Sequence, residues 1–299
     1  MKRFLIHILS FAILFFIGEK LSYFFLIQAP KREYDKRLEK IIKGEINKDL
    51  VVLGSSRGAG NVLAGQIEKE TGLTAYNLSY QGSNVIFHQF ILKTLLDYNS
   101  KPKTILLVVD NPYEFVEEES LGFRYDKLYP LTKYSYINNI LIKNGEHSSI
   151  SKFLFLERLH SCHSKLKKEK APDENPIDAS GSMPLLISNK KLPDYLMVEE
   201  NYKTDCELED RLNAFRNIQN ICREKNIELV FVVSPNYKTL NIDFIARFKK
   251  LMLPENKIKV YDTENSIYKD SSYFYDVSHL NKKGAEIFTK ELIQFINSK

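Results

Sequence analysis

Two short stretches near opposite ends of the chain contain residues that could act together as a nucleophile and its base. The stretch GSSR, at 54–57, follows an apolar run, and Asp276 and His279 lie three residues apart before a final amphipathic segment. A serine hydroxyl becomes a useful nucleophile when a histidine takes its proton, and that histidine needs an acceptor on its other ring nitrogen. The pattern predicts acyl-transfer chemistry in which Ser56 attacks, His279 moves the proton and Asp276 orients the imidazole.

The same serines have a simpler explanation as helix caps. Serine and glycine are common at helix N-termini, and GSSR follows a predicted strand. Because the Asp-x-x-His stretch offers a serine the partners that catalysis requires, we favour Ser56 as the nucleophile and regard Ser55 as the lesser candidate. Arg57 fits either a solvated residue or an anion contact beside the site.

The elements that must position these residues alternate along the chain. Apolar runs predict strands, and helical periodicity predicts helices between them: strands at 50–54, 74–80, 103–110, 228–235 and 256–262, and helices at 62–71, 83–98, 205–225 and 281–299. This alternation predicts a three-layer α/β fold with a parallel sheet between two layers of helices. Sites in such sheets lie at the carboxyl ends of the strands, where Gly82 and Asn111 also follow predicted strands.

The sheet-forming domain is expected at 49–299, with an insertion at about 112–203. The insertion is rich in Tyr, Ser, Lys and Asn and breaks the strand–helix rhythm. A lid, a partner surface and a variable decoration are all compatible with this composition. A charged linker is expected at 30–48, ahead of the domain.

The N-terminus, residues 1–29, is predicted to be a membrane anchor. Phe4–Ile17 is almost entirely apolar, and after Glu19 and Lys20 the apolar character resumes. About 20 predominantly apolar residues span a bilayer, and a lysine near the interface can extend its amine to the headgroups. A cleaved signal peptide and a buried helix are the alternatives, although no Ala-x-Ala site follows the run. Basic residues on both sides leave the orientation open.

Composition argues against several other functions. The net charge of +5 comes from scattered lysines, so nucleic-acid binding is not expected. The three cysteines, Cys162, Cys206 and Cys222, lack the spacing of a zinc site. We therefore expect no metal and no organic cofactor.

The order of the blocks resembles the SGNH, or GDSL-type, hydrolase superfamily. That family has a Gly-Asp-Ser turn, then a glycine, then Gly-x-Asn-Asp, and finally Asp-x-x-His, which correspond here to Ser56, Gly82, Asn111 and the pair Asp276 and His279. Two positions differ, because a serine replaces the aspartate of the first block and the third block lacks its glycine and final aspartate. The resemblance implies a flavodoxin-like three-layer fold, with the amides of the first two blocks and the asparagine of the third as oxyanion donors.

A GSSR turn behind a membrane anchor is similar to a subset of that superfamily. The subset includes the alginate O-acetyltransferase-like proteins and the proteins of lipoteichoic-acid D-alanylation. This similarity implies a serine esterase or O-acyltransferase that acts outside the membrane on an acyl ester of a cell-envelope polysaccharide, with a membrane-bound acyltransferase as a partner. The alternative is a catalytically silent envelope scaffold that binds a polymer or a biosynthetic partner.

Overall fold

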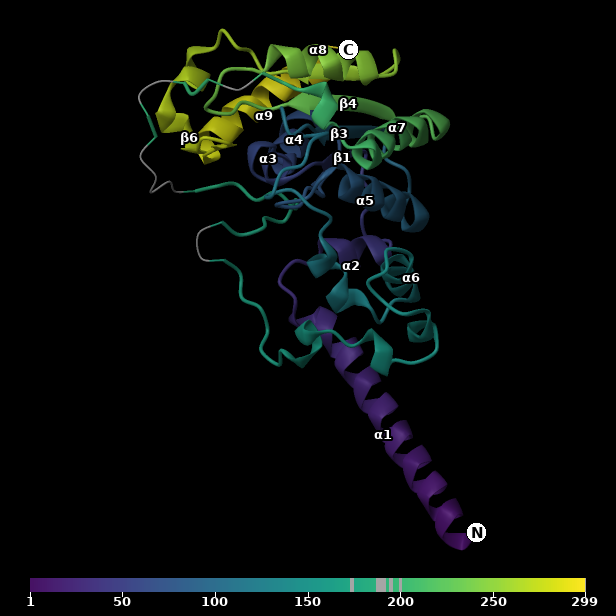
Figure 1. The fold of residues 1–299 in the computed structure, drawn as a ribbon. Coiled ribbons are helices and arrows are strands. Elements are labelled where there is room, and N and C mark those ends of the chain that lie inside the picture. Colours follow the sequence, from purple (N-terminus) through teal and green to yellow (C-terminus); the bar gives the residue numbers. More distant parts are fainter. Residues whose placement is uncertain (173–174, 187–191, 194–195, 199–200, 299) are drawn as a thin grey trace. The chain divides into compact units, whose positions relative to one another are not determined.

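The computed structural model describes residues 1–298 except 173–174, 187–191, 194–195 and 199–200. The chain divides into two compact units (Figure 1). The anchor unit consists of residues 1–39 and 124–171, and the sheet unit consists of residues 40–123 and 172–299.

The sheet unit is built on five parallel strands in the order β2-β1-β3-β4-β5. The strands are β1 (Leu50–Leu53), β2 (Ala75–Asn77), β3 (Thr104–Val108), β4 (Glu228–Val233) and β5 (Lys257–Val260). The strands β1 and β3 are buried throughout, as is typical of strands covered on both faces. All five point the same way, so their carboxyl ends meet at one edge.

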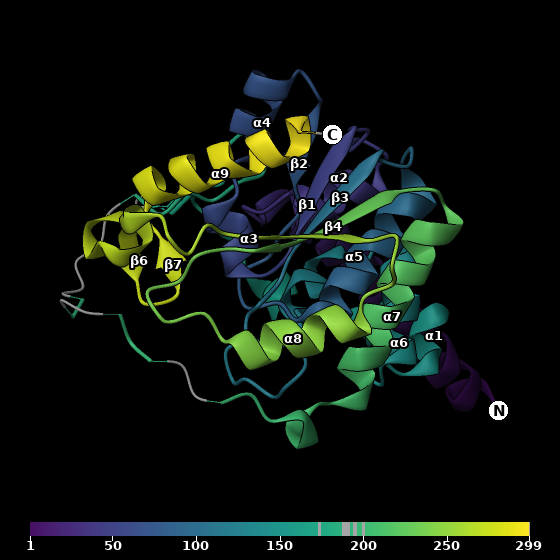
Figure 2. The ribbon, with the colours of Figure 1, turned by 90° about the horizontal axis from the view of Figure 1, so that it is seen from above.

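Helices cover both faces of the sheet, and the predicted α/β class is confirmed (Figure 2). On one face α9 (Lys282–Asn297) packs against α3 (Ser56–Asn61) and α4 (Ala64–Thr71). On the other face α5 (Val85–Tyr98) packs against α7 (Glu209–Glu224). The sheet unit also holds the short 3-10 turns Thr204–Cys206, Ser266–Lys269 and Ser271–Tyr273.

Three elements differ from the sequence-based expectation. A helix α8 (Ile242–Leu251), which was not predicted, adds Phe244 and Phe248 to an aromatic core. The helix expected at 62–71 begins only at Ala64, because the chain is extended at the two preceding residues and a separate short helix, α3, lies before them. The Asp-x-x-His segment forms a small antiparallel hairpin, β6 (Phe274–Asp276) and β7 (His279–Leu280).

The anchor unit contains α1 (Lys2–Arg32), α6 (Ser135–Lys143) and several 3-10 turns. The turns are η1 (Tyr125–Lys127), η2 (Tyr129–Leu131), η3 (Ser149–Lys152), η4 (Leu156–Arg158) and η5 (Ser161–Ser164). A short helix, α2 (Arg37–Ile42), crosses the boundary between the units. By length and composition α1 could cross a membrane, and a signal sequence would meet the same criteria.

Candidate active site

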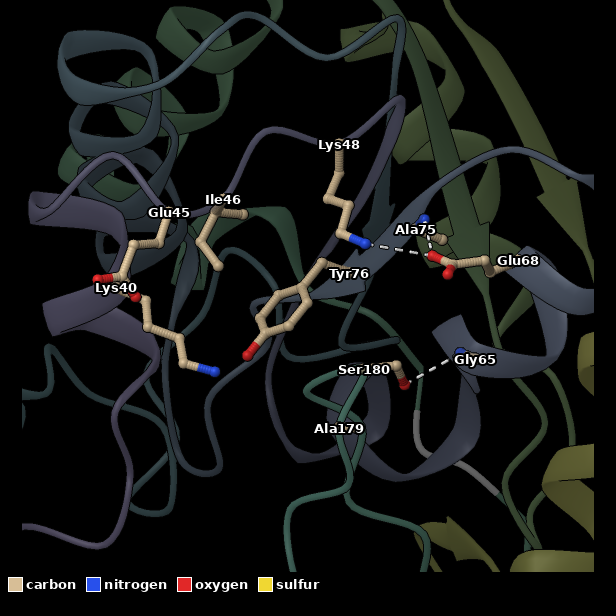
Figure 3. Close-up of a pocket in the computed structure, with 10 residues that line it drawn as sticks. All are labelled: Lys40, Glu45, Ile46, Lys48, Gly65, Glu68, Ala75, Tyr76, Ala179 and Ser180. Carbon is tan, nitrogen blue, oxygen red and sulfur yellow. Dashed lines mark hydrogen bonds and ion pairs between the residues drawn. The ribbon is translucent and has the colours of Figure 1, made fainter.

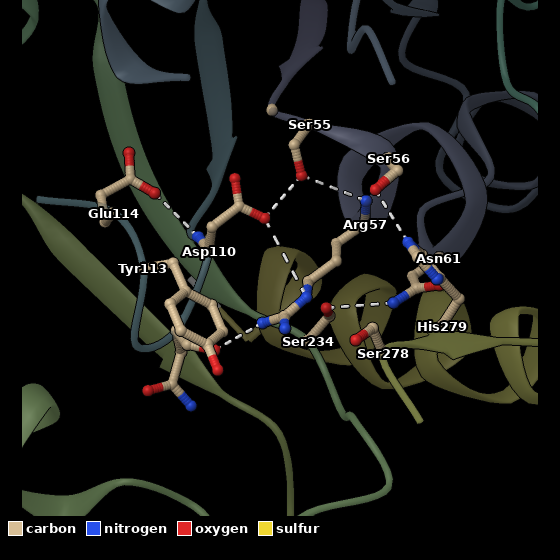
Figure 4. A network of polar contacts seen from close by, with 12 residues as sticks. Ser55, Ser56, Arg57, Asn61, Asp110, Tyr113, Glu114, Ser234, Ser278 and His279 are labelled. Carbon is tan, nitrogen blue, oxygen red and sulfur yellow. Dashed lines mark hydrogen bonds and ion pairs between the residues drawn. The ribbon is translucent and has the colours of Figure 1, made fainter. Parts of the chain in front are cut away.

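Three residues predicted to form a catalytic relay lie within hydrogen-bonding distance of one another. Ser56 is the first residue of α3, directly after the loop that follows β1. Its Oγ lies 2.7 Å from Nε2 of His279 (Figure 4). Nδ1 of His279 lies 2.8 Å from Oδ1 of Asp276. A proton on Nδ1 directed to the carboxylate leaves Nε2 as an acceptor for the serine hydroxyl. The arrangement can therefore take a proton from Ser56 as its oxygen attacks.

The relay is partly open to solvent. The side chains of His279 and Asp276 are 20% and 18% exposed, respectively. Asp276 is also fixed from within its own turn, because its Oδ1 accepts the backbone N–H of Ser278 at 2.8 Å. A substrate can therefore approach residues that are already held in place.

Asn61, a residue that the sequence did not single out, joins the two parts of the relay. It is the last residue of α3 and is fully buried. Its Oδ1 accepts the backbone N–H of Leu280 at 3.1 Å, and its Nδ2 donates to Oγ of Ser234 at 3.1 Å. One amide thus ties the nucleophile helix to the hairpin of His279 and to the end of β4. In the sequence, only its position five residues after Ser56 pointed to a role for Asn61.

Small residues let the nucleophile turn approach the sheet closely. A Cβ on Gly54, whose φ is +152°, would lie 3.0 Å from the backbone oxygen of Val108. A Cβ on Gly58 would lie 2.4 Å from Oγ of Ser79. Packing around Ser56 therefore requires glycine at positions 54 and 58.

Ser55 has a different set of partners from its neighbour. As the N-cap of α3, its Oγ accepts the backbone N–H of Arg57 at 3.3 Å. The same hydroxyl donates to Oδ1 of Asp110 at 2.5 Å, in a fully buried contact. Ser55 is thus a capping residue held by a carboxylate, and its hydroxyl is directed away from His279 (Figure 4).

Arg57 is buried, so the solvated alternative for this residue is wrong. Its Nη1 donates to the backbone oxygen of Asn111 at 2.6 Å, and its Nε lies 4.0 Å from Oδ1 of Asp110. A buried guanidinium needs a nearby negative charge. Arg57 therefore connects the nucleophile turn to the end of β3, and its role toward substrate stays a prediction.

Two buried carboxyl groups lie beside this arginine. Burial raises the pKa of Asp110 above its usual value, and the Arg57 charge and the Ser55 hydrogen bond oppose that rise. Burial, with the negative charge of Asp110 as the second cause, raises the pKa of Glu114 to about 8. Glu114 Oε2 accepts the backbone N–H of Asp110 at 2.7 Å. The guanidinium of Arg57 favours the charged form of Asp110, and a pKa of about 8 leaves Glu114 mostly protonated at neutral pH.

The predicted oxyanion donors lie on turns next to Ser56. The turn of Gly82 packs against the nucleophile loop, since Tyr80 N–H donates to the backbone oxygen of Gly54 at 2.9 Å and Ser83 Oγ donates to the same oxygen at 3.2 Å. Asn111 is buried after β3, and its side-chain oxygen has no hydrogen-bond partner within the described part of the chain. None of the hydrogen bonds among the described residues joins Gly82 or Asn111 to Ser56, so their catalytic roles stay predictions.

Asn236 is a second residue that the sequence did not single out. It follows β4 and is buried, and neither its amide oxygen nor its amide nitrogen has a hydrogen-bond partner among the described residues. The next residue, Tyr237, donates its N–H to the backbone oxygen of Val277 at 2.8 Å, within the catalytic hairpin. Asn236 is thus a buried amide next to the hairpin that carries Asp276 and His279.

Two cavities lie in the sheet unit. One of about 780 Å³ begins at Pro112 and Tyr113, directly after Asn111, and is also lined by Tyr202, Lys203 and Lys238. The other, of about 390 Å³, lies near β2 and is lined by Tyr76 and the ion pair of Lys48 with Glu68 (Figure 3). The larger one is lined by none of the three relay residues, and Pro112 in its lining follows Asn111, whose backbone oxygen binds Arg57. In the part of the chain that is described, no group of three or more His, Cys, Asp or Glu side chains could hold a metal ion.

The comparisons with known proteins do not show which class this protein belongs to. No family model matches the chain, and no curated protein matches it. Among solved structures, the chain is similar to the acetyl xylan esterase Est2A from the rumen bacterium Butyrivibrio proteoclasticus, with 10% identity and a TM-score of 0.34. The match covers 83% of this chain and 63% of the esterase chain, so the chain spans less than two thirds of that protein. A likeness at this level does not define a function.

Proposed function

We propose that the protein is a serine-dependent esterase or O-acyltransferase. The observation that carries this proposal is the continuous contact from Asp276 through His279 to Ser56, at 2.8 and 2.7 Å. Three groups in this order are the requirement for activating a serine hydroxyl. Their partial exposure at the carboxyl edge of a parallel sheet is the usual setting of a site in this architecture.

The reaction proceeds in two halves. Ser56 Oγ forms a bond to the ester carbonyl carbon as its proton passes to His279 Nε2, and Asp276 stabilises the imidazolium. The ester C–O bond then breaks, the proton moves from His279 to the departing alcohol, and the acyl group stays on Ser56. Water or a sugar hydroxyl next gives its proton to His279 Nε2 and attacks the acyl carbon. The bond from that carbon to Ser56 Oγ then breaks and His279 returns the proton to Ser56 Oγ, which completes hydrolysis or transfer.

The substrate that we propose is an acyl ester of a cell-envelope polysaccharide. The cavity that begins at Pro112 supports this choice, since Tyr113 and Tyr202 offer aromatic faces and Lys203 and Lys238 offer hydrogen-bond donors. Figure 4 places Tyr113 on the same side of the relay as Arg57. With α1 as a membrane anchor, the sheet unit would act outside the membrane, and a membrane-bound acyltransferase that supplies the acyl group is the partner we propose.

A fluorophosphonate probe tests the nucleophile directly. The full-length protein is expected to be labelled, and Ser56→Ala is expected to abolish labelling and hydrolysis of an aryl acetate. Ser278→Ala is the matched control, because this serine lies between Asp276 and His279 without belonging to the relay. A folded wild-type protein that stays unlabelled would favour the silent scaffold, and label that survives Ser56→Ala would exclude Ser56 as the nucleophile.

An analysis of the reaction products distinguishes hydrolysis from acyl transfer. The enzyme is incubated with an acetyl ester donor and a polysaccharide acceptor, and the acetylated glycan and free acetate are both measured. A transferase forms acetylated glycan in proportion to acceptor, whereas an esterase releases acetate whether or not acceptor is present.

A further inference from the structure

The part of α1 that has no protein around it is too short to cross a bilayer. Every side chain from Lys2 to Ile17 is exposed, and the first buried residue of α1 is Ser22. From Phe4 to Ile17 the helix reaches only about 21 Å, against a hydrocarbon core of about 30 Å. A span of about 20 residues from Phe4 ends near Tyr23. With α1 as the membrane anchor of the proposed function, the hydrocarbon boundary lies beyond Ile17, where α1 enters the folded part of the anchor unit.

Glu19, which interrupts the apolar sequence, makes hydrogen bonds inside the protein near the expected membrane boundary. Its carboxylate accepts the backbone N–H groups of Phe155 at 2.9 Å and Leu156 at 3.0 Å, which caps the turn η4. The ring of Phe155 packs against Tyr23, with centroids 5.0 Å apart. Backbone donors inside the hydrocarbon must be satisfied within the protein, and Glu19 satisfies two of them close to its expected boundary. The contacts fix η4 to α1 at the expected boundary.

The turns fixed in this way expose large apolar side chains. Phe153 is 83% exposed, Ile150 is 54% exposed and Leu156 is 47% exposed. The backbone N–H groups of Phe153 and Leu154 both donate to the oxygen of Ile150, so one compact turn carries the first two of these side chains. We call Ile150, Phe153 and Leu156 the interfacial patch. Exposed apolar groups gathered in this way mark an interaction surface.

We propose that the interfacial patch lies in the surface of the lipid bilayer. The anchor unit then rests on the membrane as well as being tethered to it by α1. We choose lipid as the occupant because the apolar surface of the span continues to the level of η4. Leu21 and Phe24 of α1 are exposed there as well. Lys20 and Lys152 are exposed beside these residues, and their long stems let the amines reach headgroup phosphates.

The chain has no tryptophan, so a single substitution provides a clean depth probe. Full-length Phe153→Trp is reconstituted in phosphatidylcholine vesicles that carry bromine atoms either near the headgroup or deep in the acyl chains. We expect the introduced tryptophan to lose most of its emission to the shallow bromines and less to the deep ones. Phe11→Trp, in the middle of the apolar run, should be quenched by the deep bromines, and Asn139→Trp, on the exposed side of α6, by neither.

Two results would overturn the proposal. Emission from Phe153→Trp that is quenched by aqueous acrylamide and by neither brominated lipid would show that the patch faces water. Emission that is shielded from both, and that varies with the ratio of protein to lipid, would show that a second copy covers it. Adding Glu19→Ala to Phe153→Trp should weaken the shallow quenching, because η4 loses both acceptor oxygens, whereas Glu19→Gln keeps one of the two and should weaken it less.

Discussion

Two polar clusters meet at the GSSR turn, and adjacent serines belong to different ones. Ser56 belongs to the relay with His279 and Asp276, whose side chains are about one-fifth exposed. Ser55 belongs to a buried cluster with Asp110 and Arg57, whose side chains are about one-twentieth exposed. Both clusters pair a serine hydroxyl with a carboxylate, either directly or through a histidine.

The difference shows that a serine and a carboxylate can serve two different roles, depending on their surroundings. In the relay an imidazole separates the serine from the carboxylate, so the serine proton can leave and return. In the buried cluster the hydroxyl contacts the carboxylate at 2.5 Å, and Arg57 balances the charge of that carboxylate. Such a contact holds the backbone and offers no site for substrate. We therefore expect changes in the relay to lower activity and changes in the buried cluster to lower stability.

The largest effect is expected from Asp276→Asn. An amide cannot enforce the proton on Nδ1 of His279, and the corresponding change in serine triads lowers kcat by about 10⁴-fold. Steady-state hydrolysis of an aryl acetate measures the effect. Asp270→Asn is the control, because it caps the nearby turn at Ser271 through Ser272 N–H and can do so as an amide. A loss below about ten-fold would mean that Asp276 does not orient His279.

The next effect is a pH dependence of stability that comes from Glu114. The folded pKa is about 8 against an ordinary 4.5, so the folded state binds the proton more tightly than the unfolded state. The contribution of protonated Glu114 to the unfolding free energy is therefore fully present below about pH 4.5. It is lost as the pH rises toward about 8, by at most about 1.4 kcal/mol per pH unit. Glu114→Gln keeps the acceptor for Asp110 N–H and should flatten this part of the profile. Urea unfolding across the window measures the slope.

The exposed Glu117 provides a matched control for that experiment. Glu117→Gln makes the same chemical change three residues away, outside the buried cluster. It should leave the slope of the wild type unchanged. An equal slope in the wild type and in Glu114→Gln would mean that Glu114 is already ionised in the folded protein.

A loss of about 3 kcal/mol in unfolding free energy is expected from Asp110→Asn. Removing one partner of a buried pair leaves the Arg57 charge uncompensated. The same change removes the negative charge that raises the pKa of Glu114, so the pH dependence should move to lower pH. Asp97→Asn, at an exposed position of α5, is the control. Unchanged stability together with an unchanged pH profile would show that Arg57 does not depend on Asp110.

The sequence predicted the layers of the sheet unit and the three members of the relay. Apolar runs located β1, β3 and β4 because buried parallel strands leave a continuous signal, whereas β5 alternates lysine with apolar residues and is only partly buried. Ser56 and the Asp-x-x-His pair could be found because catalysis by serine requires those residue types. The missed helix α8 had a signal as well, since Asn241 caps it and Phe244 and Phe248 follow the helical period.

The remaining features depend on contacts that no local pattern carries. Asp110 meets a serine 55 residues earlier in the chain, and Glu114 is buried although carboxylates are seldom found inside. Asn61 and Asn236 are small polar residues whose importance comes from burial alone. The capping of η4 by Glu19 likewise joins positions 136 residues apart. Charge or polarity in a sequence does not say which side chains folding will enclose.

The smallest effect is expected from Ser55→Ala, and it tests the division between the serines most directly. The change removes the N-cap of α3 and the hydrogen bond to Asp110, and should lower the unfolding free energy by about 1–2 kcal/mol. Ser56 keeps its contact with His279, so fluorophosphonate labelling should persist. A slight shift of α3 would lower the labelling rate by about ten-fold or less. Ser55→Thr restores a hydroxyl and should recover part of the stability. If Ser55→Ala abolished labelling in a folded protein, the two clusters would act as one site and the adjacent serines would share the catalytic role.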